Sequence, residues 1–350
     1  MTDPLTTIIL VNWNTLEDTL ACLDSLSYIT YSNWNTVVVD NGSENEEAQR
    51  IKTLYPDVIV LETGENLGFT GGNNRGIEHA LSHGAEFIMC LNNDTTVAPD
   101  FLSLMVSAMI SDPKIGIATS TIFYHSEPER VAALGCWVYL DRSPTVGHIL
   151  SPAQLDNSLE KVIDVPFAEG CVLMMSREVA EKTGGFNDQF FAYLEDADLG
   201  LKTHKLGCRI VLVPAAHVWH KIGSKEGGQG SPRAIYYCMR NSWHLVNAHA
   251  SVTERKMFRS SMLRHLIKQW SAFLESSIVL NGLRKHYPHR HRELVAHTTG
   301  LLSGISGRTG RQKDHGVDKI MQTTITLLAW LADAGGKLLH PLYRLRKRLK

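Results

Sequence analysis

The first hundred residues alternate between short apolar segments and helical segments, and this alternation limits the chain to few folds. The apolar segments, rich in β-branched residues, are residues 7–11, 36–39, 58–61 and 87–91. Between them, residues 16–26 have helical periodicity, a short polar helix ends near Leu54, and residues 74–82 form a further predicted helix. Strands that alternate with helices build parallel sheets, and nearly continuous apolar strands indicate that both sheet faces are covered. We therefore predict an α/β fold with a largely parallel sheet between helices.

Beyond Pro99 the pattern changes to shorter strands and loops. Strands are predicted at residues 117–123, 131–138 and 162–176, followed by a helix at 195–205 and a strand at 209–213. Residues 223–230 are rich in glycine and predict a mobile loop. From Arg233 onward the chain has a helical pattern, and it ends in a basic segment.

Charge divides the chain into two parts. The 350 residues carry a net charge of −1, but residues 1–250 contain 16 Lys and Arg against 30 Asp and Glu, whereas residues 251–350 contain 19 against 6. We predict one domain over residues 1–250 and a basic helical extension over 251–350. A basic helical tail suits the surface of an anionic membrane, and it equally suits a soluble helical cap with a solvated end. The rest of the chain contains no recognisable nucleic-acid-binding module, so no nucleic acid partner is expected.

The six cysteines are scattered singly, without a Cys-x-x-Cys pair. Several lie in apolar runs, so we expect buried free thiols in a reducing compartment. The N-terminus lacks a basic region followed by a long apolar stretch, and no run reaches the roughly 18 apolar residues of a membrane-spanning helix. The expected location is the cytoplasm, in solution or on the inner face of the membrane.

Polar residues follow each of the four early strands. They are Asn12-Trp13-Asn14, Asp40-Asn41-Gly42-Ser43, residues 62–72 and Asn92-Asn93-Asp94. Taken singly, each group fits a turn, because Asn, Asp and Gly favour turns. Ligands of parallel α/β sheets bind beyond the carboxyl ends of the strands, so the four groups together predict a binding site at this edge.

Two residue types in these segments suit metal binding. A carboxylate at a strand end, such as Asp94, suits Mg²⁺, which takes few protein ligands together with phosphate oxygens. His220 follows a predicted strand and suits a metal that a carboxylate already holds. The alternatives are an Asn/Asp turn for Asp94 and a packed or solvated side chain for His220.

Three acidic residues, Glu195, Asp196 and Asp198, begin the predicted helix at 195–205. Acidic residues in a first helical turn stabilise the helix dipole, which is one explanation of the motif. The other is a catalytic base that faces the site. Asp196 and Asp198 are two residues apart and cannot face the same way on a helix, so at most one of them is the base.

A glycine-rich motif, residues 66–74, precedes the helix predicted at 74–82. Glycine lets the backbone approach a ligand closely, and a helix N-terminus offers free amides to an anion. The spacing fits neither a dinucleotide fingerprint nor a phosphate-binding P-loop, and a plain glycine-rich turn is the alternative.

In their order along the chain, these motifs resemble the family 2 glycosyltransferases with the GT-A fold, particularly the bacterial rhamnosyltransferase-like branch. The resemblance covers roughly residues 5–245. It rests on Val11-Asn-Trp-Asn14, Asp40-Asn-Gly-Ser43, Asn66-Leu-Gly-Phe69, Leu91-Asn-Asn-Asp94, Gly184-Gly-Phe-Asn187, Phe191 to Leu199, Trp219-His220 and Arg240-Asn241. It implies a GT-A (Rossmann-like) catalytic domain over residues 1–250.

The resemblance also implies roles for individual residues. Asp196 would be the catalytic base that deprotonates the acceptor hydroxyl. The donor would be bound by Asn12, Asp40, Asn66, Gly72, Asn93 and Asp94, with Asp40 on the pyrimidine base. Asp94 and His220 would hold Mg²⁺ or Mn²⁺ on the diphosphate. Glu169, Glu195, Asp198, Trp219, Arg240 and Asn241 would lie on the acceptor side or support the site.

The implied reaction is transfer of a sugar from a nucleotide diphosphate to a hydroxyl, with inversion, in cell-surface polysaccharide synthesis. The acceptor would be a glycan or a polyprenyl-linked sugar, and the favoured donor is dTDP-rhamnose, followed by UDP-hexoses. The loop at 223–230 would close over the donor. Asn92 departs from the family, which often has a carboxylate there, and leaves less negative charge for the cation.

Two other functions remain as alternatives. A sugar nucleotidyltransferase would carry a glycine-rich, basic triphosphate loop near its N-terminus, and residues 8–14 contain none. A non-catalytic sugar-nucleotide-binding protein of the same fold would not need Asp94, Asp196 and His220 together.

Overall fold

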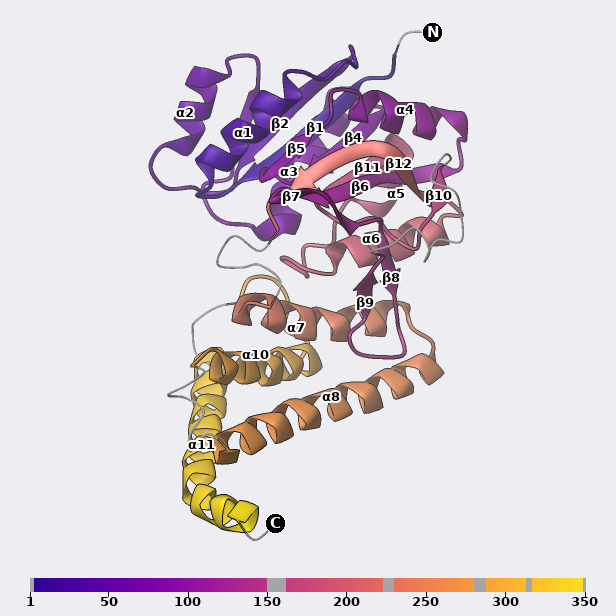
Figure 1. Cartoon of the computed structure of the whole chain (residues 1–350). Coiled ribbons are helices and arrows are strands. Elements are labelled where there is room, and N and C mark those ends of the chain that lie inside the picture. Colours follow the sequence, from indigo (N-terminus) through magenta and orange to yellow (C-terminus); the bar gives the residue numbers. More distant parts are fainter. Residues whose placement is uncertain (1–2, 150–161, 223–229, 280–287, 313–316, 349–350) are drawn as a thin grey trace. The chain divides into compact units, whose positions relative to one another are not determined.

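The structure, a computed structural model, describes residues 3–149, 162–222, 230–279, 288–312 and 317–348 (Figure 1). The predicted glycine-rich loop at 223–230 lies, apart from Gly230, outside these residues. The chain forms two units. Unit 1 contains Met1–Val138 and Val146–Ile222, and unit 2 contains Tyr139–Thr145 and Gly223–Lys350.

Unit 1 is built on one large sheet. Within the described residues its strands are β1 (Thr6–Asn12), β2 (Trp34–Asp40), β3 (Ile59–Glu62), β4 (Phe87–Leu91), β5 (Thr95–Val97), β6 (Ile115–Tyr124), β7 (Glu127–Ala133), β10 (Ile163–Asp164), β11 (Val172–Ser176) and β12 (Arg209–His220). The order along the sheet is β10-β12-β6-β11-β4-β1-β2-β3. Neighbours among β1 to β4 pair in parallel, as do β6 and β12, whereas β11 runs antiparallel to β4 and β6. The predicted α/β fold with a largely parallel sheet is confirmed.

Helices cover both faces of this sheet (Figure 1). They are α1 (Leu16–Leu26), α2 (Glu47–Leu54), α3 (Gly68–Ser82), α4 (Phe101–Ser111), α5 (Arg177–Thr183) and α6 (Glu195–Lys205). Ile8 and Leu10 share a core with residues of α1 and α4. Ile9 points to the opposite face, as strand geometry requires, and packs against Gly76 of α3.

Helix α3 begins at Gly68, well before the predicted start at residue 74. Its glycines have low helix propensity, which is why the sequence pattern indicates a turn. A side chain at Gly72 would place its Cβ 2.8 Å from Val11 Cγ1, and at Gly76 2.4 Å from Ile9 Cγ2. Close packing of α3 on β1 therefore requires small residues, and this packing outweighs their propensity.

Other elements also differ from the prediction: the strands predicted at 131–138 and 162–176 are each interrupted, and helix α5 lies where none was predicted. Helix α4 was expected to be loop or strand, because its sequence is apolar on nearly all sides and lacks the amphipathic pattern of a surface helix. Strand β12 continues to His220 instead of ending at residue 213. The residues at 217–220 therefore lie in a strand rather than after one.

Unit 2 is helical, as the sequence pattern from Arg233 onward predicts, and it begins before residue 251, where the basic extension was predicted to start. Its helices are α7 (Pro232–His249), α8 (Val252–Val279), α10 (Pro288–Ile305) and α11 (Val317–Arg348). Helix α10 packs closely on α7, where a Cβ on Gly300 would lie 2.5 Å from the carbonyl oxygen of Tyr236. No described helix is both long enough and apolar enough to cross a membrane.

A β-hairpin contributes residues to both units. Its strands, β8 (Cys136–Val138) and β9 (Val146–His148), pair antiparallel in unit 1, and its tip, residues 139–145, belongs to unit 2. The tip is fixed by hydrogen bonds from the Ser143 N–H to Ser261 Oγ, 3.1 Å, and between the hydroxyls of Thr145 and Ser242, 2.9 Å. The six cysteines are free thiols, and four of them are buried.

Candidate active site

The carboxyl ends of β1 and β2 are joined through Asn12. Its side chain is 0% exposed, and its Nδ2 donates to Asp40 Oδ2 and Ser43 Oγ, both at 3.0 Å. Its Oδ1 accepts from Thr19 Oγ1 at 2.7 Å. The amide of Asn12 is therefore satisfied inside the protein, and its structural effect is to orient the Asp40 carboxylate.

Two more predicted donor residues brace neighbouring elements. Asn66 Oδ1 accepts the N–H of Gly68 at 2.8 Å, at the start of α3. Asn93 Nδ2 donates to the hydroxyls of Thr15 and Thr19 at 2.6 and 2.7 Å, which ties the end of β4 to α1. Gly72, inside α3, packs on Val11, so the structure gives it a packing role.

Asn41 belongs to one of the predicted polar groups but was given no role of its own, although it holds the same region together. Its Nδ2 donates to the carbonyl oxygen of Gly68 at 2.9 Å, and its Oδ1 accepts the N–H of Leu67 at 3.0 Å. An asparagine after a strand carries a turn signal in any sequence, and only the tertiary structure shows that this one fixes the loop before α3.

Asp94 and His220 lie side by side. Pairing of β5 with β12 places His220 opposite Thr95, and the distance between His220 Nε2 and Asp94 Oδ1 is 3.0 Å. Asn92 Nδ2 lies 3.4 Å from the same His220 nitrogen. One carboxylate oxygen and one imidazole nitrogen at this spacing fit a shared divalent cation whose other positions go to phosphate and water.

A lysine beside this pair was missed by sequence reasoning. Lys221 follows His220, its backbone N–H donates to the carbonyl oxygen of Asp94 at 3.1 Å, and its Nζ lies 2.9 Å from Asp18 Oδ1. The ion pair ties the end of β12 to α1, next to Asp94. A single lysine after a strand gives no sequence signal of such a role.

Asp196 lies in the first turn of α6 and accepts two backbone N–H groups. Its Oδ2 accepts from Gly170 at 3.0 Å, and its Oδ1 accepts from Ala197 at 2.8 Å. Burial, with the negative charge of Glu169, outweighs these N–H groups and raises the pKa of Asp196 to about 6. A carboxylate with such a pKa suits a general base near neutral pH.

The two acidic neighbours of Asp196 have different surroundings. Glu195 is 5% exposed, and burial, reinforced by the charge of Asp196, raises its pKa well above the usual range. Asp198 is also buried, and its Oδ2 lies 2.7 Å from Lys202 Nζ. The three acidic side chains of this turn are thus distinct. Burial favours the neutral form of Glu195, Asp196 accepts the N–H of Gly170, and Asp198 forms an ion pair with Lys202.

Residues 169–171 connect Asp196, the predicted base, to the predicted metal ligands Asp94 and His220. Gly170 binds Asp196, and the carbonyl oxygen of Cys171 accepts the N–H of Asn92 at 2.9 Å, beside Asp94. Burial, together with the charges of Glu169, Asp94 and Asp196, raises the pKa of the Cys171 thiol well above its usual range. The predicted base and the predicted metal ligands therefore lie around one segment of unit 1.

Three predicted supporting residues lie in other surroundings. Trp219 packs on Phe123, with ring centroids 6.0 Å apart, and as the strand neighbour of His220 it points to the opposite face. Arg240 and Asn241 lie in α7 of unit 2. The buried Arg240 guanidinium stacks on Tyr237 and donates from Nε to Asn241 Oδ1 at 2.9 Å, and both contacts lie within α7.

Comparison with known proteins identifies the class and then the family. The fold is that of the GT-A glycosyltransferases: a mannosyltransferase from Pyrobaculum calidifontis, solved in complex with GDP-Man and Mn²⁺, is similar with a TM-score of 0.51 and 16% identity, over 97% of this chain and 88% of that one. The family described as Glycosyl transferase family 2 matches residues 7–184. This chain belongs to that family, and it is a glycosyltransferase.

Two curated relatives extend the similarity. The N-acetylglucosaminyl-diphospho-decaprenol L-rhamnosyltransferase of Mycobacterium tuberculosis is 28% identical over 221 residues, 59% of this chain and 72% of the relative. The low-salt glycan biosynthesis hexosyltransferase of Haloferax volcanii is 25% identical over 313 residues, 87% of this chain and 92% of the relative. These similarities confirm the predicted rhamnosyltransferase-like branch, and family membership argues against the nucleotidyltransferase alternative.

Proposed function

We propose that this protein transfers a sugar, with inversion at the anomeric carbon, from a nucleotide diphosphate to a hydroxyl group. The favoured donor is dTDP-rhamnose, and the acceptor is a glycan or polyprenyl-linked sugar of cell-surface polysaccharide synthesis. The relatives support this choice, because one is a rhamnosyltransferase that acts on a decaprenol-linked sugar and the other a glycan hexosyltransferase.

The observation that carries the proposal is the arrangement around residues 169–171. The N–H of Gly170 binds Asp196. Asp94 Oδ1 and His220 Nε2 lie 3.0 Å apart, and the nearby Asn92 donates its backbone N–H to the carbonyl oxygen of Cys171. A base and a cation site beside one short segment can act on opposite sides of the anomeric carbon, the base where the new bond to the acceptor forms and the cation where the bond to the diphosphate breaks. The acceptor hydroxyl loses its proton to Asp196 while the diphosphate leaves on the side of Asp94.

Each group has a separate chemical task in this reaction. Asp196 removes the acceptor proton as the new glycosidic bond forms, and general bases of this kind contribute about 10²–10⁴-fold to rates. Asp94 and His220 would hold Mg²⁺ or Mn²⁺, which neutralises charge on the leaving diphosphate. Asn12 keeps Asp40 oriented toward the edge of the sheet, where the nucleotide base would bind.

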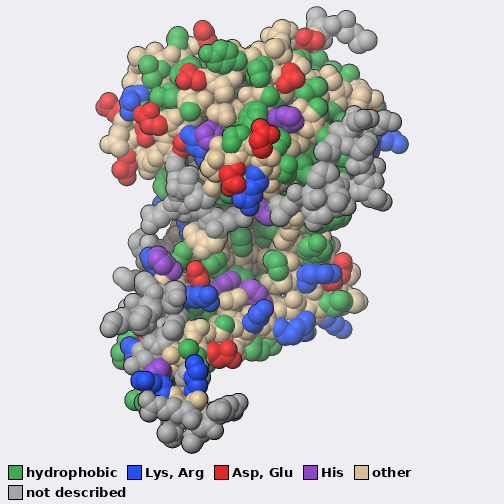
Figure 2. Space-filling view, in the orientation of Figure 1, with side chains coloured by type: hydrophobic (Ala, Val, Ile, Leu, Met, Phe, Trp, Pro, Cys, Tyr) green, Lys and Arg blue, Asp and Glu red, His purple; other side chains and the backbone are tan. Residues whose placement is uncertain are grey.

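We also propose that unit 2 rests on an anionic membrane, where a polyprenyl-linked acceptor is found. Figure 2 shows Lys and Arg side chains beside hydrophobic ones on this unit. On α8, exposed Arg264 and Lys268 neighbour Leu263 and Ile267, which are 57% and 55% exposed. A helix that exposes leucine and lysine together suits the interface between lipid headgroups and acyl chains.

Substitution of the base tests the catalytic proposal. Asp196→Asn keeps the shape of the side chain and removes its basicity, so we expect transfer to fall by about 10²–10⁴-fold. Donor binding, measured by calorimetry, should stay within a few-fold of the wild type. Asp57→Asn, in an exposed turn, is the matched control and should keep full activity. Unchanged transfer by Asp196→Asn would refute the assignment of Asp196 as the base, whereas a wild-type protein that binds donor without transferring it would favour the non-catalytic alternative.

A further inference from the structure

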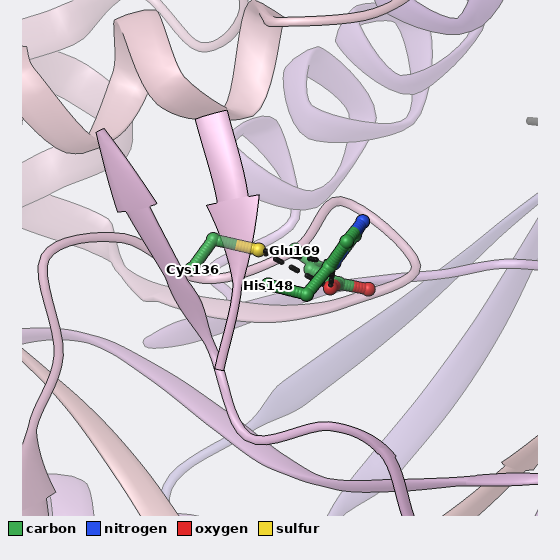
Figure 3. Close-up of side chains that lie close together, drawn as sticks. All are labelled: Cys136, His148 and Glu169. Atoms are coloured by element: carbon green, nitrogen blue, oxygen red, sulfur yellow. Dashed lines mark hydrogen bonds and ion pairs between the residues drawn. The ribbon is translucent and has the colours of Figure 1, made fainter. Parts of the chain in front are cut away.

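A second group of metal-binding side chains lies next to the base, on different elements from Asp94 and His220. Cys136 begins β8 and His148 ends β9, and the hairpin register places them directly opposite each other. Glu169 joins them from the segment before β11, which is drawn in by a hydrogen bond from the Cys136 N–H to the carbonyl oxygen of Phe167, 3.1 Å. Figure 3 shows the three side chains pointing toward one another.

The ligand atoms converge on one point. Cys136 Sγ lies 3.5 Å from His148 Nδ1 and 3.2 Å from Glu169 Oε1, and His148 Nδ1 contacts the same Glu169 oxygen. One atom from each residue lies within 4.8 Å of the other two. The imidazole uses Nδ1 for both contacts, so it does not pass a proton from thiol to carboxylate through its two nitrogens. Convergence on a single point is the arrangement of ligands around one ion.

The chemistry of the three ligands selects the ion. A thiolate, an imidazole and a carboxylate together suit Zn²⁺, and the thiolate is the ligand that Mg²⁺ disfavours. Tetrahedral zinc ligands lie about 3.3–3.7 Å from one another, close to the observed separations from Cys136. The Cys136 side chain is buried, and the His148 side chain is 34% exposed, which leaves access for water.

We propose that Cys136, His148 and Glu169 bind a Zn²⁺ ion, with water in the fourth position, at a site separate from the donor cation. Binding releases the thiol proton of Cys136 to solvent, and no electron transfer is involved. The ion would fix Glu169 and with it the next residue, Gly170, whose N–H binds Asp196. Zinc would thus be a positioning group for the base, and this last step rests on the proposed role of Asp196.

Zinc binding is tested on the full chain without reference to activity. Protein stripped with a chelator is titrated with Zn²⁺ in excess Mg²⁺, and metal content is measured by mass spectrometry. We expect one zinc per chain, and at least about tenfold weaker binding for Cys136→Ser and His148→Ala. Cys208→Ser, which removes a thiol outside the cluster, should bind like the wild type. A wild-type protein that retains no zinc, or Cys136→Ser with unchanged affinity, would overturn the site.

Cobalt provides a test that needs no variant. Co²⁺ bound by a thiolate gives a charge-transfer absorption in the near ultraviolet, so wild-type protein with one Co²⁺ should show this band. Bound cobalt without the band would overturn the role of Cys136. The band tests the ligand set even if the variants fail to fold.

The positioning step has a separate readout. Removing zinc while Mg²⁺ remains should lower kcat and shift the acidic limb of the pH profile, with little change in the KM for donor. An unaltered profile in zinc-free protein would overturn the positioning role. Failure of the proposed transferase activity gives a different result: zinc would still bind, but no donor would be turned over.

Discussion

At the scale of single residues, opposing effects set the basicity of Asp196. Burial and the charge of Glu169 raise its pKa, while the N–H groups of Gly170 and Ala197 lower it, and the net value is about 6. A carboxylate that is too acidic would accept no proton, and one that is too basic would be protonated at neutral pH. The observed balance keeps Asp196 ionised near pH 7 and more basic than an exposed aspartate.

The pH dependence of transfer follows from this balance. The base works in its ionised form, so kcat should be constant above about pH 7, fall to half near pH 6, and then drop about tenfold per further unit. Initial rates with saturating donor between pH 4.5 and 8 would measure this. Donor binding at the same pH values is the control, since its loss would mimic the effect. A rate that stays flat down to pH 5 would contradict the assignment.

The residues of the site differ in how far the sequence alone could reveal them. Asp94, Asp196 and His220 stand in motifs whose order along the chain is informative. Cys136 and His148 carry no such spacing, and they meet only through the register of a short hairpin. The sequence also does not show that the side-chain amide of Asn12 makes its hydrogen bonds within the protein, because this depends on where Asp40 and Ser43 lie.

At the scale of elements, α11 has two unlike faces. Ile325, Ala329 and Asp333, spaced by four residues, are buried, and Asp333 accepts a hydrogen bond from Ser277 of α8 at 3.0 Å. The opposite face carries a leucine stripe, defined as Leu327, Leu331 and Leu338, whose residues are 54%, 51% and 79% exposed. In the proposed membrane contact, this stripe is the face of α11 that would enter the lipid surface.

The leucine stripe predicts a membrane-binding defect. Burial of a leucine is worth about 1.5–3 kcal/mol, so replacing all three with serine should weaken binding to phosphatidylglycerol vesicles by well over about tenfold. Co-sedimentation of the full chain with vesicles is the measurement. Leu54→Ser, an exposed leucine of α2 in unit 1, is the control and should bind normally. If the triple variant bound vesicles as well as the wild type, the leucine stripe would not be the membrane contact.

The elements themselves were predictable to different degrees. Strands β1, β2 and β4 and helix α1 were predicted because each has a clear apolar period and polar ends. Helix α4 was not, because an apolar run without amphipathic periodicity does not distinguish a buried helix from strands. The start of α3 depends on contacts of Gly72 and Gly76 with β1, which no local signal contains.

At the scale of the whole molecule, the two cation sites should be separable in one assay. After EDTA treatment and return of one equivalent of Zn²⁺, we expect transfer from dTDP-rhamnose to return only when Mg²⁺ or Mn²⁺ is added, by at least about tenfold. Comparing the transfer rates with UDP-hexoses and with dTDP-rhamnose shows which of these donors the enzyme prefers. Full activity in EDTA would show that Asp94 and His220 need no cation.

The hairpin formed by β8 and β9 limits how this enzyme can be divided. Its strands belong to unit 1 and its tip to unit 2, so the polypeptide passes between the units after residues 138, 145 and 222. A fragment ending at Ile222 would keep the tip but lose Ser242 and Ser261, to which the tip is hydrogen-bonded. Chimeras with related transferases therefore have to exchange residues 139–145 together with the helices. A single crossover point would leave a foreign tip on native helices.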